Sequence, residues 1–185
     1  MSDSVFVTSG LVKDVIDEAP AKILQISYNG KVLNPGDNLT PTEVKDVPTV
    51  TYDASPDTFY TLINHDPDAP SRADPKFGEF QHWVKMNIPG NDVNKGEEMT
   101  AYIGSGAPKG TGLHRYLFLL YKQTNGKIDT SVIPSIPNNT AEGRRSQKAR
   151  EWASKYNLEL VAGNFYLAEW DEYVPTLHAQ LGFGK

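Results

Sequence analysis

The chain has 185 residues, 38% of them hydrophobic and 22% charged, with a formal net charge of −5 and no cysteine. This length suits one domain with a substantial core, so we expect a single domain over residues 1–185. The acidic balance argues against nucleic acid and anionic membrane surfaces as partners, and the lack of cysteine excludes disulfides and thiolate metal sites.

The first 20 residues contain neither a basic segment nor a long apolar run. They therefore predict neither a signal peptide nor a membrane-spanning helix. We expect a cytoplasmic protein without membrane insertion.

Residues 22–123 are dominated by an alternation of apolar and polar residues with a period of two, which is typical of β-strands. Near the start of this region, Leu24, Ile26 and Tyr28 fall on one strand face. The Asn-Gly pair that follows them suits the positive φ angles of a tight turn. The sequence therefore predicts a β-hairpin at this point.

Six further segments are rich in β-branched and aromatic residues and are bounded by Pro, Gly, Asn or Asp. We expect strands at residues 49–53, 58–66, 80–88, 99–104, 113–123 and 160–170. Many short strands with this punctuation favour a mostly β fold, an antiparallel β-sandwich with short flanking helices.

A helix is predicted within residues 138–158. Its apolar stripe follows the spacing i, i+3, i+4 and i+7 and consists of Ala149, Trp152, Ala153 and Tyr156. Basic residues are expected on its exposed surface, namely Arg144, Arg145, Lys148 and Arg150.

A second helix is predicted over residues 174–185. Pro175 fits its first turn, and Leu177 and Leu181 share a face, with His178 beside that face.

Two histidines head apolar strand faces. Strand alternation places His82 with Val84, Met86 and Ile88, and His114 with Tyr116, Phe118 and Leu120. A buried imidazole bonded to backbone or tyrosine is the commoner arrangement, so each histidine alone is compatible with a structural role. Two of them at strand starts, near an acid, favour a functional site.

That acid is Asp66, which ends a row of buried positions on its strand. A buried carboxylate is costly unless donors satisfy it. Two interpretations stay open: Asp66 orients an imidazole, or Asp66 or Asp68 forms an Asx-turn with backbone amides. Arg72 and Arg115 are likewise either anion clamps or structural ion-pair partners of the aspartates in this loop.

A glycine-rich segment precedes His114. It has four glycines, Gly104, Gly106, Gly110 and Gly112. Glycines permit close backbone approach and can aim N–H groups at an anion, although this spacing matches neither the P-loop nor the dinucleotide fingerprint. These parts suit a small anion pocket at one end of the sandwich. Charged imidazoles would favour the anion, so binding should raise histidine pKa values and tighten as the pH falls toward 6.

Two enzymatic alternatives are considered, and the first uses the same histidines and acid. Two histidines and one carboxylate, here His82, His114 and Asp66, can form a metal site for a metal-dependent enzyme. The chain has no H-E-x-x-H motif to support that alternative. A serine hydrolase, for which Ser105 would be the nucleophile, is disfavoured because no G-x-S-x-G occurs.

The motifs DPDAPSR (66–72), HW (82–83) and GSGAPKGTGLHRY (104–116) resemble the phosphatidylethanolamine-binding protein family, in particular its animal branch, which includes the Raf kinase inhibitor protein. The resemblance extends over roughly residues 20–183. It implies a β-sandwich whose pocket binds phosphate-like anions, including phosphatidylethanolamine head groups, without an established cofactor. It also implies a signalling role as an inhibitor of kinases or serine proteases.

By motif position, the resemblance implies a set of pocket residues: Asp66, His82, Gly104, Gly106, Pro108, His114, Tyr116 and Leu181. We add Phe80 and His178, where the chain departs from the vertebrate-like pattern, as it also does at Phe77, Gln81 and Ala107. The departures remove a phenol and an indole N–H from the rim, and His178 adds a donor. The resemblance also places the C-terminal helix beside the pocket. A further interpretation is that the chain inhibits a partner protein through its surface loops, and that a ligand in the pocket moves this helix and so changes the inhibition.

Overall fold

The computed structural model describes residues 2–183. Seven strands form a large sheet and three form a smaller one. In order, the large sheet contains β1 (Lys22–Ile23), β10 (Leu158–Ala168), β9 (His114–Gln123), β6 (Phe59–Asp66), β7 (Phe80–Pro89) and β8 (Glu97–Thr100), and β4 (Asp37–Asn38) also pairs with β10. The small sheet contains β3 (Lys31–Val32), β2 (Gln25–Tyr28) and β5 (Thr49–Thr51). The predicted mostly β fold is confirmed.

Most strand pairs are antiparallel, as expected, but β1 and β4 pair with β10 in parallel. The predicted hairpin joins β2 to β3, and its turn residues Asn29 and Gly30 have φ angles of 50° and 81°. The strand predicted at residues 99–104 is displaced toward the N-terminus, because the backbone leaves the sheet after Thr100 and Ala101 N–H donates to the Ile136 carbonyl.

Apolar side chains of both sheets fill the space between them. Leu24 and Ile26 are fully buried there and belong to the same core as Tyr60, Leu62 and Phe118 of the large sheet. Removing this apolar surface from water is the main force that holds the two layers together.

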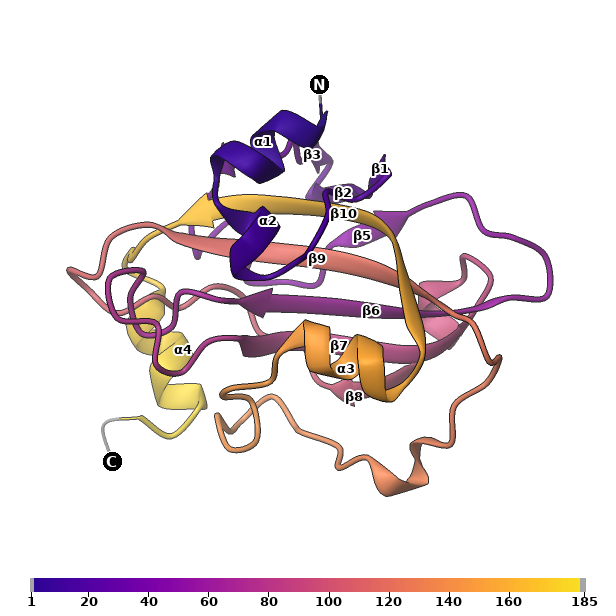
Figure 1. Ribbon diagram of the computed structural model, residues 1–185. Coiled ribbons are helices and arrows are strands. Elements are labelled where there is room, and N and C mark those ends of the chain that lie inside the picture. Colours follow the sequence, from indigo (N-terminus) through magenta and orange to yellow (C-terminus); the bar gives the residue numbers. More distant parts are fainter. Residues whose placement is uncertain (1, 184–185) are drawn as a thin grey trace.

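A second core covers the other face of the large sheet, where Figure 1 shows α1 (Ser2–Thr8), α2 (Leu11–Asp14) and α3 (Ala149–Lys155). Phe6 and Leu11 are fully buried in this core, beside Ala149 and Phe165. The sequence did not indicate α1 and α2, because four to seven residues give too short a stripe to recognise.

The helix predicted within residues 138–158 begins only at Ala149, and residues 138–148 form turns and irregular backbone. Gly143 and Ser146 have positive φ angles that a helix does not allow. The expectation that Arg144 is exposed is therefore wrong. Its buried guanidinium donates to four backbone carbonyls, those of Thr140, Gln81, Ala101 and Pro137.

The predicted C-terminal helix is α4 (Val174–Gln180), with Pro175 in its first turn and Leu177 and Leu181 buried as expected. The last two residues of the predicted range, Gly184 and Lys185, lie outside the described residues. Two short 3₁₀ helices, η1 (Val93–Lys95) and η2 (Thr130–Val132), complete the elements. No helix within residues 2–183 has the length and apolar character needed to cross a bilayer.

The prediction that His82 shares a strand face with Val84 and Met86 is wrong. Asn64 pairs with Trp83 and His65 with Gln81, so His82 is an extra residue in β7, a β-bulge. The bulge turns His82 and Trp83 toward the core between the sheets, whereas Val84 and Met86 face the other core. The simple alternation is valid for β9, which has no bulge beside β6.

Candidate functional site

Three strand ends and α4 surround a cavity of about 370 Å³ at one end of the sandwich. Strands β6 and β9 are antiparallel, so Asp66 at the end of β6 lies near His114 at the start of β9. Strand β7 begins on the other side of β6, with Phe80 opposite Asp66. The topology therefore brings residues distant in sequence to one place.

Nine of the ten candidate residues line this cavity: Asp66, Phe80, His82, Gly106, Pro108, His114, Tyr116, His178 and Leu181. The tenth, Gly104, is not among the residues that line the cavity. A Cβ atom at this position would lie 2.6 Å from the Val44 carbonyl oxygen, so the close approach of glycine serves internal packing. That these ten residues bind a ligand stays a prediction.

Both interpretations of Asp66 apply, because each of its carboxylate oxygens has a different donor. The Asp68 backbone N–H donates to Oδ1 over 2.7 Å, which forms the Asx-turn, and His114 Nδ1 donates to Oδ2 over 2.7 Å. Burial is the largest influence on the pKa of Asp66 and raises it, and the hydrogen bond from His114 opposes that shift.

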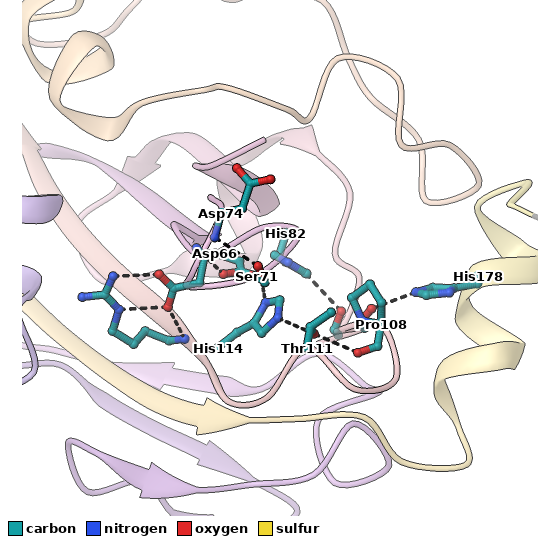
Figure 2. Close-up of polar contacts among 12 residues, drawn as sticks. Asp66, Ser71, Asp74, His82, Pro108, Thr111, His114 and His178 are labelled. Carbon is teal, nitrogen blue, oxygen red and sulfur yellow. Dashed lines mark hydrogen bonds and ion pairs between the residues drawn. The ribbon is translucent and has the colours of Figure 1, made fainter. Parts of the chain in front are cut away.

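Figure 2 shows His114 held between Asp66 and Thr111. The Thr111 hydroxyl donates to the Pro108 carbonyl over 2.8 Å, so its oxygen is left to accept from His114 Nε2, 2.9 Å away. Asp66 and Thr111 together fix the orientation of the His114 ring.

His82 has no carboxylate partner. Its Nδ1 lies 3.0 Å from the Gly104 carbonyl oxygen and 3.2 Å from that of Ile103, and two acceptors require Nδ1 to carry the hydrogen. Burial, together with the charge of Arg144, lowers the pKa of His82 from 6.5 to about 3. His82 is therefore neutral at pH 7, and its Nε2 presents a lone pair. The expectation that a charged imidazole attracts an anion therefore does not apply to His82 in the unliganded protein.

Tyr116 adds an unused hydroxyl to the floor of the cavity. Its ring stacks on His114 on one side and on Tyr166 on the other, with centroid distances of 6.1 and 5.1 Å. The side chain is 1% exposed, and its hydroxyl has no hydrogen-bond partner among the described residues. A buried hydroxyl without a partner is costly, which favours a ligand or water there.

The glycine-rich segment acts through packing and turns. A Cβ atom on Gly106 would lie 2.8 Å from Leu177 of α4, so this glycine lets the helix approach. Gly110 and Gly112 have positive φ angles and open surroundings, as in turns. His178 Nε2 donates to the Gly106 carbonyl over 2.8 Å, so the donor expected at His178 holds α4 to this segment.

Sequence reasoning missed one charged residue of the cavity, Arg145, which it placed on a helix surface. Arg145 lines the cavity, and its guanidinium carbon lies 4.3 Å from the centre of the Phe77 ring. The neighbouring Gly143 and Ser146 were the available signal, because both disfavour a helix at this point. Apolar wall residues were also missed: Ala69, Pro70, Ile103, Leu177 and Phe183.

The other two arginines considered from the sequence lie outside the cavity lining. Arg115 donates to both carboxylate oxygens of Asp68, over 2.9 and 2.7 Å, and both side chains are buried. The structural interpretation of Arg115 is confirmed. Arg72 donates to the Ser9 carbonyl over 2.9 Å instead of pairing with an aspartate of its own loop.

The structure does not assemble the enzymatic alternatives. Within residues 2–183, no group of three His, Asp or Glu side chains is placed to hold a metal ion. Ser105 is fully buried, and its hydroxyl has no hydrogen-bond partner in the described part of the chain, so no base activates it.

The fold and site define a class: a two-sheet β protein with a small cavity of apolar walls and a polar floor, suited to binding a small molecule. The model of the phosphatidylethanolamine-binding protein family matches residues 28–166. The chain belongs to the phosphatidylethanolamine-binding protein family.

Known relatives agree with this assignment. The chain is 36% identical over 169 residues to "Putative odorant-binding protein A5" of Drosophila melanogaster, covering 90% of this chain and 80% of the relative. A carboxypeptidase Y inhibitor, solved in complex with its cognate proteinase, is 30% identical, with a TM-score of 0.78 and coverage of 92% and 95%. A Plasmodium vivax phosphatidylethanolamine-binding protein shares the fold at 22% identity, with a TM-score of 0.78 and coverage of 92% and 98%.

Proposed function

We propose that this chain is a non-enzymatic binding protein whose cavity takes a phospholipid head group or a similar small phosphate-bearing ligand. The convergence of Asp66, His82, His114 and Tyr116 on one cavity carries the proposal. The relatives are named as binding proteins or inhibitors, which supports a role without catalysis.

The size and chemistry of the cavity support a head group. A volume of about 370 Å³ is in the range of small-molecule sites. The walls are mainly apolar. Four polar lining residues, Asp66, His82, His114 and Tyr116, are buried, whereas Arg145 is exposed. A small ligand with one charged end can contact the polar residues with that end and the apolar walls with the rest of the molecule.

Isothermal titration calorimetry with phosphoethanolamine tests this function. We expect saturable binding to the wild-type chain and clearly weaker binding to His114→Ala, which loses the partner of Asp66. Lys127→Ala is the control, because Lys127 is exposed and lies outside the cavity. If wild type shows no heat of binding at millimolar phosphoethanolamine, inorganic phosphate or phosphocholine, the proposed function is wrong.

A second candidate function is inhibition of a protease. Its support is the likeness to the carboxypeptidase Y inhibitor, at 30% identity over most of both chains. We expect the purified chain to slow hydrolysis of a peptide substrate by carboxypeptidase Y in a dose-dependent manner. Unchanged hydrolysis at a large molar excess of the chain would remove this candidate.

Two finer points stay predictions. Inhibition of a protein kinase and a wider signalling role rest on the resemblance to the animal branch. A cytoplasmic location is the second of these predictions. Imaging of the chain fused at its C-terminus to a fluorescent protein tests the location, and fluorescence confined to the secretory pathway would contradict it.

A further inference from the structure

A second cavity, of about 430 Å³, opens on the side of the large sheet that the helices cover. Its walls come from residues 133–137, from residues 140–143 and from Trp152 of α3. Its most buried lining residues are Gln81 and Thr100, each 1% exposed. No described residue lines both this cavity and the one beside α4, so the two are separate.

Hydrogen bonds to the backbone hold the walls of this second cavity in place. The N–H of Ile136 donates to the Met99 carbonyl over 2.8 Å, and the N–H of Ala101 donates to the Ile136 carbonyl over 2.9 Å. The buried guanidinium of Arg144 donates to the Pro137 carbonyl over 2.8 Å. The cavity is therefore part of the folded structure.

The side-chain amide of Gln81 leaves a donor unused at the inner end of the second cavity. The Thr100 hydroxyl donates to Gln81 Oε1 over 2.9 Å. Nε2 of Gln81 is buried and has no hydrogen-bond partner among the described residues. A buried N–H group without a partner is costly, so an oxygen atom of a ligand that accepts from Nε2 would be bound favourably.

The remaining lining favours a neutral ligand. Of the described residues that line the second cavity, none is a lysine, arginine or histidine, and the ionisable one is Glu142, which is exposed. Ile133, Ile136 and Trp152 supply apolar surface. The indole N–H of Trp152 already donates to Gln147 Oε1 over 3.1 Å, so its ring offers an apolar face. An anion such as phosphate finds no positive charge here, whereas an apolar body finds matching walls.

We propose that the second cavity binds a small neutral molecule with an apolar body and one carbonyl or hydroxyl oxygen, which accepts a hydrogen bond from Nε2 of Gln81. The site is independent of the proposed function, because it shares no lining residue with the first cavity. Acetophenone is a suitable probe, since it joins an apolar ring to one carbonyl. Ethylbenzene has nearly the same shape and lacks the oxygen.

Nuclear magnetic resonance of ¹⁵N-labelled wild type locates the binding site. On titration with acetophenone, the side-chain amide of Gln81 and the indole N–H of Trp152 should shift in a saturable manner. The resonances of His82 and Tyr116, in the first cavity, should stay in place. Ethylbenzene should bind roughly tenfold more weakly than acetophenone, because it cannot accept the hydrogen bond.

A matched variant tests the role of the Gln81 amide. Gln81→Met combined with Thr100→Val removes both polar partners and keeps similar side-chain volumes, a change that a fold tolerates better than the loss of one partner. We expect acetophenone to bind this double variant roughly tenfold more weakly than wild type, and ethylbenzene to bind both equally. Gln180→Met is the control, because Gln180 is exposed on α4 and outside the lining of the second cavity.

Three results would overturn the proposal. They are equal affinity of acetophenone for wild type and the folded double variant, shifts confined to the first cavity, and no shift at millimolar acetophenone. If the double variant does not fold, the two probes decide on wild type alone, and equal affinity for acetophenone and ethylbenzene overturns the proposal. Binding of phosphoethanolamine is measured separately, so failure here leaves the proposed function intact.

Discussion

Strand β6 carries two histidine–carboxylate pairs on opposite faces of one sheet. On the cavity face, Asp66 accepts a hydrogen bond from His114, and on the other face His65 lies 2.8 Å from Glu79. All four side chains are buried. The two pairs have the same chemistry, so the pairing alone does not define a functional site.

The surroundings make the difference. Glu79 also accepts from the backbone N–H of Ala149 over 2.8 Å, at the first residue of α3, so this pair holds a helix on the sheet. Burial acts to raise the pKa of Glu79, but His65 and the Ala149 amide outweigh it and the pKa is lowered. The pKa of Asp66 is raised. Both carboxylates have partners within the protein, and the difference is that Asp66 lines the cavity beside α4, whereas Glu79 does not.

The comparison sharpens with His82, a third buried histidine that has no carboxylate partner. Its pKa is lowered from 6.5 to about 3. Between pH 6.5 and pH 3, His82 is therefore protonated in the unfolded chain and neutral in the folded chain. Stability from this group is complete above pH 6.5 and is lost as the pH falls toward 3.

We therefore expect the unfolding free energy of His82→Gln to decrease less than that of wild type as the pH is lowered. At pH 3 the decrease should be smaller by about 4 kcal/mol. Urea unfolding at a series of pH values measures the effect. Parallel curves for wild type and His82→Gln would show that His82 is not held neutral.

Removal of the structural pair should mainly affect stability. In Glu79→Gln the amide oxygen can still accept from Ala149, but His65 loses its charged partner. We expect a loss of about 3 kcal/mol of unfolding free energy, as for other broken buried pairs. Affinity for phosphoethanolamine, measured under conditions where the variant is folded, should be unchanged. An equal loss of affinity would mean that the two faces are coupled.

The matched change on the cavity face should mainly affect binding. In Asp66→Asn one of the two hydrogen bonds, from Asp68 or from His114, loses its charged acceptor. We expect affinity for phosphoethanolamine to fall by about 2 kcal/mol and stability to fall by less than in Glu79→Gln. Calorimetry and urea unfolding measure the two effects. The reverse order of the two losses would contradict the division of roles.

The sequence predicted the parts of the molecule in which pattern and structure agree. Strands β6 and β9 alternate regularly over eight and ten residues, so their faces and the positions of Asp66 and His114 were predictable. The resemblance added Pro108 and assigned Gly106 and Leu181 to the pocket, which the sequence pattern alone did not do.

The rest depended on contacts between distant segments. The bulge at His82 has no local signal, because it arises from the pairing of β7 with β6. The burial of Arg144 depends on carbonyls from three separate segments, and Arg145 reaches the cavity only because its neighbour is anchored there. The low pKa of His82 depends on burial and on the nearby charge of Arg144. The residues adjacent to His82 in the sequence indicate neither.

Chemical-shift mapping tests the central claim most directly, because it reports both faces of β6 in one experiment. On titration with phosphoethanolamine, the resonances of Asp66, His82, His114 and Tyr116 should shift in a saturable manner, while those of His65 and Glu79 stay in place. Shifts confined to other surfaces, or none at millimolar ligand, would contradict the account.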